Sequence, residues 1–272
     1  MYALDWAGGL LTEAGVQTIA HALAMKGLPA CLMSLMRHDY MRRNNQGVYM
    51  AYGALAIEAA LAKLWPPHGG ELMEVAKAAV DETVERYIKP DGGSYEGTGY
   101  VSSTVGHALT AYQLYARHRD LPLAEVVPEK LLNTERYFST MASTVPPAGG
   151  SICVGDGGHP GAILFPSFLG SLSRLTDSPT LKSLLAGIMP NTPERENVAT
   201  PGAVFNIIYG PDELGDTEVV RPPTFSLLPN TGQLCSCRET EDGFVPRVVK
   251  ERFAVRSQPV RVVLTVSVDP VA

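Results

Sequence analysis

The sequence predicts a mainly α-helical protein that ends in the first strands of a β-sheet. Stretches with apolar residues at helical spacing, joined by short turns, fill the chain up to about residue 190. Beyond this point prolines become frequent, the helical periodicity fades, and β-branched residues begin to alternate in part with polar ones. We therefore expect a helical domain over residues 1–220 and the start of a β-domain over residues 221–272.

The individual elements follow from this spacing and from local start signals. Thr12 followed by Glu13 is typical of a helix start. Apolar spacing predicts helices over residues 12–26, 45–64, 71–88, 100–117, 128–141, 163–175 and 180–189. Residues 35–43 fit either an exposed loop or a short helix. Strands are predicted over residues 233–238, 252–256 and 262–268.

Short connections have a consequence for where the helix ends lie. Helices joined by short turns pack antiparallel to their neighbours in the chain, so the first and third helices of a run point the same way. Asn44 and Asn45 begin one helix, and Tyr100 begins the helix two further on. We therefore expect these residues at one end of the helical layer. The positive ends of two helix dipoles meet there, which favours an anionic ligand.

The loop over residues 90–100, Pro-Asp-Gly-Gly-Ser-Tyr-Glu-Gly-Thr-Gly-Tyr, holds four glycines and one proline and fits neither a plain helix nor a plain strand. Such a loop can place a tyrosine at a fixed point on a surface, at the start of the following helix. The alternative is an ordinary connection between helices with turn glycines.

Composition excludes several classes of function. With 45% hydrophobic and 18% charged residues the chain is typical of a globular protein. A net charge of −6 offers no electrostatic footprint for nucleic acid or for an anionic membrane. We see no apolar run long enough to cross a bilayer and no signal peptide. The four cysteines, Cys31, Cys153, Cys235 and Cys237, fit buried or incidental thiols, and we expect neither a metal nor a cofactor.

Two motifs together resemble a known family. The Asn-Asn pair at residues 44–45 and the Asp-Gly-Gly…Glu-Gly-Thr-Gly-Tyr loop one helix pair later are similar to motifs of the heparinase II/III-like and alginate-lyase-like polysaccharide lyases. A Gly-Asp in the loop near residue 155 and a Thr-Gly…Arg strand near residue 231 agree with this resemblance. The likeness covers the chain from about Leu4 to Arg256.

The resemblance implies a fold, a reaction and residue roles. The fold is an (α/α) toroid, here incomplete, followed by an antiparallel β-sandwich, here truncated. The reaction is β-elimination at a uronic acid of an acidic polysaccharide, by a secreted or periplasmic enzyme without a cofactor. Asn44 or Asn45 matches the position near the substrate carboxylate, and Tyr100 matches the catalytic tyrosine. The sequence does not determine the oligomeric state.

The chain departs from the family pattern in two places. Some members have a histidine base where this chain has Asn45, and members carry a further histidine on a strand after the position of Arg256, where this chain has none. The family's leading helices are also missing before Met1. We therefore expect a lyase truncated at both ends, with activity weakened by the missing strand.

The chemistry of these side chains suits an elimination. An asparagine amide donates a hydrogen bond to a carboxylate at any pH and so stabilises the charge that develops when the α-proton leaves. A tyrosine can protonate the departing oxygen or, as phenolate, take the α-proton. Candidate substrate-binding residues around them are Arg43, Tyr49, Tyr95, Glu96, His107, Asp156 and His159.

Each candidate also has a structural alternative. The asparagines can serve only as helix caps. Tyr100 can be a core residue, and His107, two turns into the same helix, fits a packed histidine better than a base. Glu96 is expected to bind backbone N–H groups of the loop rather than to act in catalysis.

Two other functions stay open at the level of sequence. A glycoside hydrolase of the helical-toroid type needs two carboxylates, for which Glu96 and Asp156 are the available pair. A non-catalytic carbohydrate-binding fragment is favoured by the absence of the strand histidine. Formation of an unsaturated, ultraviolet-absorbing product separates the lyase from both.

Overall fold

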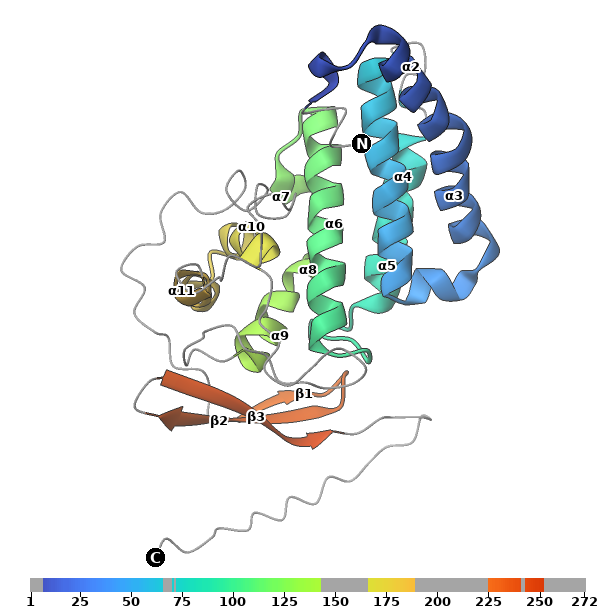
Figure 1. Cartoon of the computed structure of the whole chain (residues 1–272). Helices are drawn as coiled ribbons and strands as arrows, with labels where there is room; N and C mark the ends of the chain where they lie inside the picture. Colours follow the sequence, from blue (N-terminus) through green and yellow to red (C-terminus); the bar gives the residue numbers. More distant parts are fainter. Residues whose placement is uncertain are drawn as a thin grey trace, which may run out of the picture.

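The computed structural model describes residues 7–65, 70, 72–142, 166–188, 225–240 and 243–251. These ranges are mainly helical and end in a small antiparallel sheet (Figure 1), which confirms the predicted class. In chain order the elements are η1 (Gly8–Leu10), α2 (Glu13–Ala22), η2 (Leu23–Gly27), α3 (Leu28–Arg37), η3 (Asp39–Arg43), α4 (Asn45–Leu64), α5 (Met73–Tyr87), α6 (Thr98–Arg119), α7 (Leu123–Val126), α8 (Glu129–Leu132), α9 (Thr134–Met141), α10 (Pro166–Thr176), α11 (Pro179–Ile188), β1 (Phe225–Leu228), β2 (Gln233–Thr240) and β3 (Gly243–Glu251).

Helix α4 lies at the centre of the helical layer. It packs against α3, α5 and α6, and its predicted bounds of 45–64 are those observed. Small and branched apolar residues at helical spacing, such as Val48, Ala51, Leu55 and Leu61, are buried along it. Figure 1 shows α4 and α6 side by side, with α2 and α3 on the outer side of α4. The core therefore runs along α4.

The N-terminal helix is longer than predicted. Thr12 caps α2, its hydroxyl accepting the Gly15 N–H at 3.1 Å, as expected. The helix then continues through one π-helical segment, η2, to Arg37 and covers the first three residues of the ambiguous stretch 35–43. The short helix η3 covers Asp39–Arg43. Leu28 and Leu35 are buried against the core. This burial of apolar side chains favours the continuation of the helix.

Two helical stretches are long and apolar enough to cross a membrane by length and composition, Glu13–Arg37 and Asn45–Leu64. The expectation that no apolar run reaches that length is therefore wrong. Half of the second stretch is buried inside the protein, as in any core helix, whereas only 17% of the first is buried. Length and composition alone are weak support for a membrane span, because core helices meet the same criterion.

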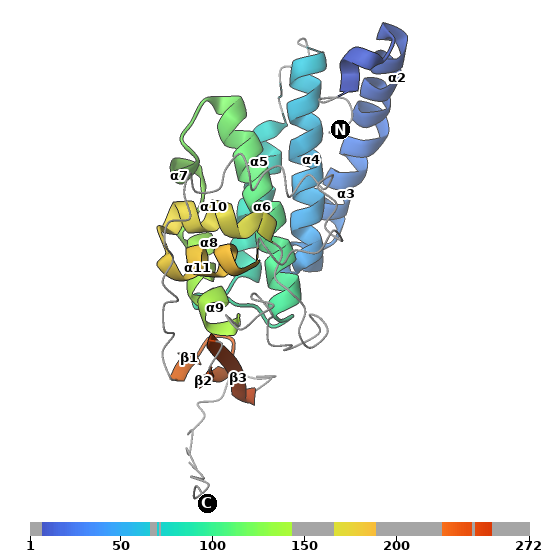
Figure 2. The ribbon, with the colours of Figure 1, turned by 60° about the vertical axis from the view of Figure 1, so that its left-hand side comes forward.

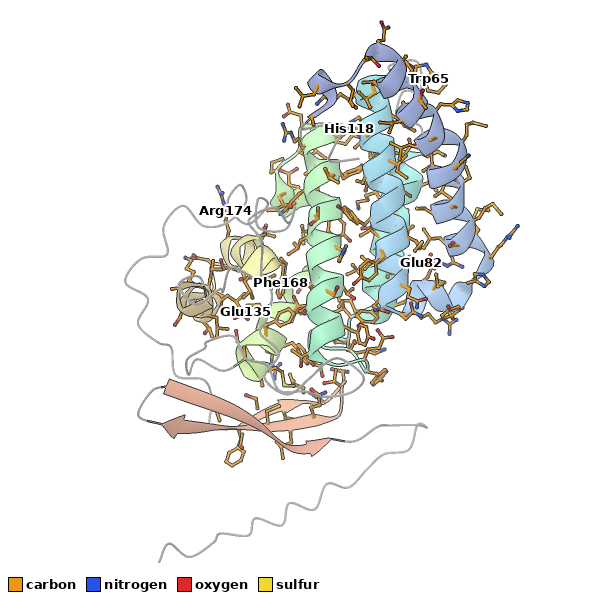
Figure 3. All side chains as sticks on the ribbon, viewed as in Figure 1. Trp65, Glu82, His118, Glu135, Phe168 and Arg174 are labelled. Atoms are coloured by element: carbon orange, nitrogen blue, oxygen red, sulfur yellow. The ribbon has the colours of Figure 1, made fainter. Side chains whose placement is uncertain are left out.

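The helix predicted over residues 128–141 is two helices. The chain turns at Asn133 between α8 and α9, where the glycine-rich loop approaches the backbone: a Cβ on Gly92 would lie 2.1 Å from the Asn133 carbonyl oxygen. On the other side of α9, Phe138 packs on Phe168 of α10, labelled in Figure 3, with 4.8 Å between ring centroids. The break lets α9 turn toward both α10 and the sheet.

The three strands form an antiparallel sheet in the order β1-β2-β3, with a register irregularity at Leu234–Cys235. Figures 1 and 2 show this sheet beyond α9, past one end of the long helices. Arg136 of α9 donates to the Leu227 carbonyl at 3.2 Å, and the sulfurs of Cys235 and Met141 lie 3.4 Å apart. The predicted strand over residues 233–238 is confirmed, and those over 252–256 and 262–268 lie outside the described residues.

Candidate functional site

The N-terminal ends of α4 and α6 lie together, as the short connections predicted. Oε2 of Glu96, two residues before α6, lies 3.4 Å from the backbone N of Asn45, the first residue of α4. One turn further along, the hydroxyls of Tyr49 and Ser103 are hydrogen-bonded to each other. We call this end, defined by Asn44, Asn45, Glu96 and Tyr100, the rim; Figure 1 shows it on the side of the sheet.

The two asparagines of the rim play different parts. Asn44 is the N-cap of α4, and its Oδ1 accepts the Gln46 N–H at 3.0 Å. The capping alternative therefore holds for Asn44. Asn45 is partly buried and uses its backbone N–H on Glu96, and within the described ranges no hydrogen bond is recorded for its side-chain amide. Of the pair, Asn45 is the better candidate to donate to a ligand.

Tyr100 is the third residue of α6 and is 38% exposed, so it is not a core tyrosine. Its position in the first turn places the phenol near the positive end of the helix dipole, which favours a negative charge there. Tyr95, in the preceding loop, is 52% exposed, and Lys89 Nζ lies 4.5 Å from its ring centroid. Both tyrosines are accessible at the surface beside the rim.

His107 lies two turns into α6 and faces α4. Its ring centroid lies 4.1 Å from that of Tyr49 and 5.5 Å from that of Tyr52. Nδ1 is 2.7 Å from the Ser103 carbonyl oxygen, and because a carbonyl only accepts, Nδ1 carries the proton. Burial lowers the pKa of His107. The side chain is therefore a neutral, packed histidine whose Nε2 bears a lone pair, which agrees with the structural alternative for this residue.

The Glu96 carboxylate accepts the backbone N–H of Asn45, across the site, whereas it was predicted to bind backbone N–H groups of its own loop. Its carboxylate faces the N-terminus of α4, where the free N–H groups and the helix dipole favour a negative charge. Its own N–H donates to Ser94 Oγ at 3.1 Å, which tightens the loop before α6. Glu96 therefore joins the starts of the two helices.

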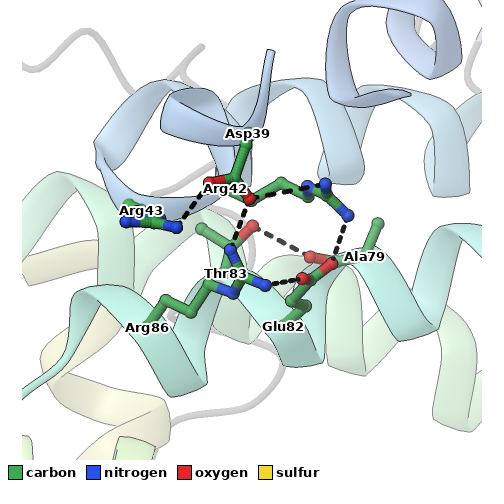
Figure 4. A network of polar contacts seen from close by, with 7 residues as sticks. All are labelled: Asp39, Arg42, Arg43, Ala79, Glu82, Thr83 and Arg86. Carbon is green, nitrogen blue, oxygen red and sulfur yellow. Dashed lines mark hydrogen bonds and ion pairs between the residues drawn. The ribbon is translucent and has the colours of Figure 1, made fainter. Parts of the chain in front are cut away.

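The arginines beside the rim are held by carboxylates. Arg43 pairs with Asp39 at 2.5 Å and keeps 65% of its side chain exposed, while Arg42 pairs with Glu82 at 2.9 Å. Arg86 of α5 bridges the two carboxylates, at 2.6 Å to Asp39 and 2.7 Å to Glu82 (Figure 4). The hydrogen bond from Arg86 lowers the pKa of Asp39. Sequence reasoning missed Arg86, since nothing in its own segment marks it.

The first half of the glycine-rich loop holds the sheet. Oδ2 of Asp91, a buried carboxylate, accepts the N–H groups of Asn230 and Thr231 at 2.8 and 2.9 Å and the Thr231 hydroxyl at 3.3 Å. Gly92 has φ of +85°, which favours glycine. A Cβ on Gly93 would lie 2.6 Å from both Thr231 and Tyr137. Sequence reasoning singled out this loop but gave no sign that it contacts a segment about 140 residues later.

Two predicted binding residues, Asp156 and His159, lie outside the described residues. Within the described ranges no group of three or more His, Cys, Asp or Glu side chains is placed to hold a metal ion. Cys31 and Cys235 are free thiols, and burial raises the pKa of Cys235 to about 11, as for an inert core thiol.

Comparison with models of protein families, with curated proteins and with solved structures finds no match to this chain. The resemblance to polysaccharide lyases therefore stays a prediction, carried by the two motifs and by the chemistry of the rim.

Proposed function

We propose that this chain is part of a polysaccharide lyase that cleaves a uronic-acid-containing polymer by β-elimination. In this proposal the helical layer belongs to an incomplete (α/α) toroid, and the three strands begin an antiparallel β-sandwich. The observation that carries it is the rim: the amide of Asn45 and the exposed phenol of Tyr100 stand at neighbouring helix starts joined by Glu96. An elimination at a uronate needs such a pair.

The proposed reaction begins with the substrate carboxylate at the N-terminus of α4. The Asn45 amide donates to one carboxylate oxygen, and the helix dipole adds a favourable positive potential. When the proton on the carbon next to the carboxylate leaves, negative charge builds up on these oxygens. A single donor of this kind lowers the barrier by about 3 kcal/mol.

Tyr100 handles the proton in this proposal. As phenolate it accepts the α-proton, the electron pair left on that carbon forms the new carbon–carbon double bond, and the bond to the 4-oxygen breaks. The phenol then returns the proton to the departing oxygen, so that the tyrosine ends as it began. Neutral His107 lines the interior behind Tyr49 rather than taking the proton.

The substrate of this proposal is an acidic polymer. The side chain of Arg43, next to the start of α4, is 65% exposed and can bind a carboxylate or sulfate of a neighbouring sugar. Tyr95 and Tyr100 offer exposed rings on which sugars stack. The overall negative charge makes these local donors responsible for the attraction.

The test is incubation with alginate, heparan sulfate and related uronates while following ultraviolet absorbance of the unsaturated product. Tyr100→Phe removes only the hydroxyl and should reduce the rate by about 10²–10⁴-fold, the usual contribution of a general acid or base. The folded Tyr95→Phe variant is the matched control and should keep its rate. A Tyr100→Phe protein at full rate would overturn the assignment.

Other outcomes distinguish the remaining functions. New reducing ends without ultraviolet absorbance would indicate hydrolysis and contradict the lyase. Binding of uronates without either signal would indicate a carbohydrate-binding fragment, which contradicts it as well.

A further inference from the structure

A buried polar cluster lies directly beneath the rim. Tyr87, the last residue of α5, is 3% exposed, and Thr104, in the second turn of α6, is fully buried. Among the described residues, neither hydroxyl oxygen has a partner at hydrogen-bonding distance. Buried hydroxyls in folded proteins nearly always find a partner, so two such groups near each other point to a function for the space between them.

The groups around the Tyr87 hydroxyl are polar. Ser94, Thr104 and Glu96 all lie close enough to act on its ionisation, and Glu96 is the charged one. Burial raises the pKa of Tyr87 strongly, and the negative charge of Glu96 raises it further. The phenol is therefore protonated throughout the physiological range and has a proton to donate. Among these groups, the carboxylate of Glu96 is the acceptor that carries a full charge.

Glu96 connects this cluster to the rim above it. The carboxylate accepts the Asn45 N–H at 3.4 Å, and it lies close enough to the phenol of Tyr87 to raise the pKa of that group. A carboxylate at a helix start is fixed in orientation only when more than one donor holds it, because a single long hydrogen bond leaves the side chain free to rotate. A second, buried donor would supply that constraint.

We infer that the Tyr87 hydroxyl donates to the Glu96 carboxylate through one water shared with Thr104, and so holds Glu96 against the N-terminus of α4. Tyr87 is then a positioning residue: it touches no substrate, and it acts on Asn45 through Glu96. The structural part of this inference stands without the proposed function. Its kinetic consequence rests on that function.

A double-mutant cycle on stability tests the structural part. Tyr87→Phe and Glu96→Ala, measured by urea unfolding at pH 7, should each raise the unfolding equilibrium constant several-fold. The effect of the double variant should be several-fold smaller than the product of the two single effects, because both changes remove the same interaction. Strictly multiplicative effects would overturn the inference.

The matched control is Tyr112→Phe. Tyr112 is another buried tyrosine between α5 and α6, but its hydroxyl donates to Asp81 at 2.9 Å, away from Glu96. Its effect should multiply with that of Glu96→Ala. If Tyr87 and Tyr112 were coupled equally to Glu96, the substitutions would be destabilising the fold as a whole. That result would contradict a specific Tyr87–Glu96 contact.

The positioning role of Tyr87 and the proposed function are tested by different measurements. In a cleaving enzyme, Tyr87→Phe should lower kcat about tenfold with little change in KM, because it misplaces a group rather than removing a substrate contact. An unchanged kcat, with the stability coupling present, would overturn the positioning role alone. A wild-type chain that yields no unsaturated product overturns the proposed function, and the stability cycle still decides the contact.

Discussion

The two halves of the glycine-rich loop differ in almost every respect although they are neighbours in the chain. Residues 91–94 are buried, and Asp91 holds the turn between β1 and β2 through three donors. Tyr95, Glu96 and Tyr100 are partly or largely exposed, and Glu96 contacts the start of α4. We call residues 91–94, which hold the sheet, the docking half of the loop, and residues 95–100 the rim half.

The difference shows how one loop can serve both structure and a candidate site. The buried half fixes the loop against α9 and the sheet, so that the exposed half starts from a rigid base. Side chains at the rim can then hold a defined geometry while they remain accessible to a ligand. Changes in the docking half should affect stability, and changes in the rim half should affect chemistry and pH dependence.

The largest effect on stability is expected from Gly92→Ala in the docking half. The added Cβ would lie 2.1 Å from the Asn133 carbonyl oxygen, and φ of +85° disfavours any residue with a side chain. Strain and overpacking together should cost about 4 kcal/mol. Urea unfolding measures this loss of stability. The control is Gly8→Ala, because no atom lies within 4 Å of the Cβ position of Gly8. A nearly equal loss of stability in the Gly92→Ala and Gly8→Ala variants would contradict the tight packing of the docking half.

The substitution Asp91→Ala should have the next largest effect on stability. It leaves the N–H groups of Asn230 and Thr231 without their acceptor, while the Thr231 hydroxyl keeps the Leu228 carbonyl at 3.3 Å. With each unsatisfied buried donor costing about 1–3 kcal/mol and partial relaxation at the turn, we expect a loss of about 3 kcal/mol. Asp91→Asn keeps an acceptor oxygen and should lose less. A smaller loss for the alanine variant than for the asparagine variant would contradict the docking role.

His107, behind the rim, should make stability depend on pH. Burial lowers its pKa in the folded state, while the unfolded side chain titrates near ~6.5. The unfolded state therefore binds the proton first, and stability is full above that value and lost as pH falls through the folded-state pKa. Unfolding at pH 7.5, 6.5 and 5.5 should show wild type losing stability relative to His107→Gln. A constant difference across this range would argue that the imidazole is well solvated.

Tyr95→Ala in the exposed half should have the smallest effect on stability. The side chain is 52% exposed and its recorded partner is the Lys89 ammonium over the ring. Loss of an exposed cation–π contact is expected to cost about 0.5 kcal/mol. Calorimetry checks this, and uronate binding by the same variant should weaken if the ring stacks on sugar. A loss as large as that of Asp91→Ala would remove the contrast between the two halves.

Part of this molecule was predictable from local sequence. The helix over residues 45–64 and the caps at Thr12 and Asn44 depend on apolar spacing and on side-chain oxygens beside free N–H groups, which are local. The shared end of α4 and α6 followed from short connections alone. The break at Asn133 did not, and the loop that packs against this backbone lies some 40 residues earlier in the chain.

By itself, the sequence determined the helical class, the candidate pair of amide and phenol, and the end of the layer at which they meet, because periodicity and short turns act over a few residues. The tertiary structure alone assigned Asn44 to the cap and Asn45 to the rim, tied Asp91 to a turn about 140 residues away, and buried Tyr87 beneath Glu96. These choices depend on which surfaces pack together, and packing between distant segments leaves no mark in the spacing of either one.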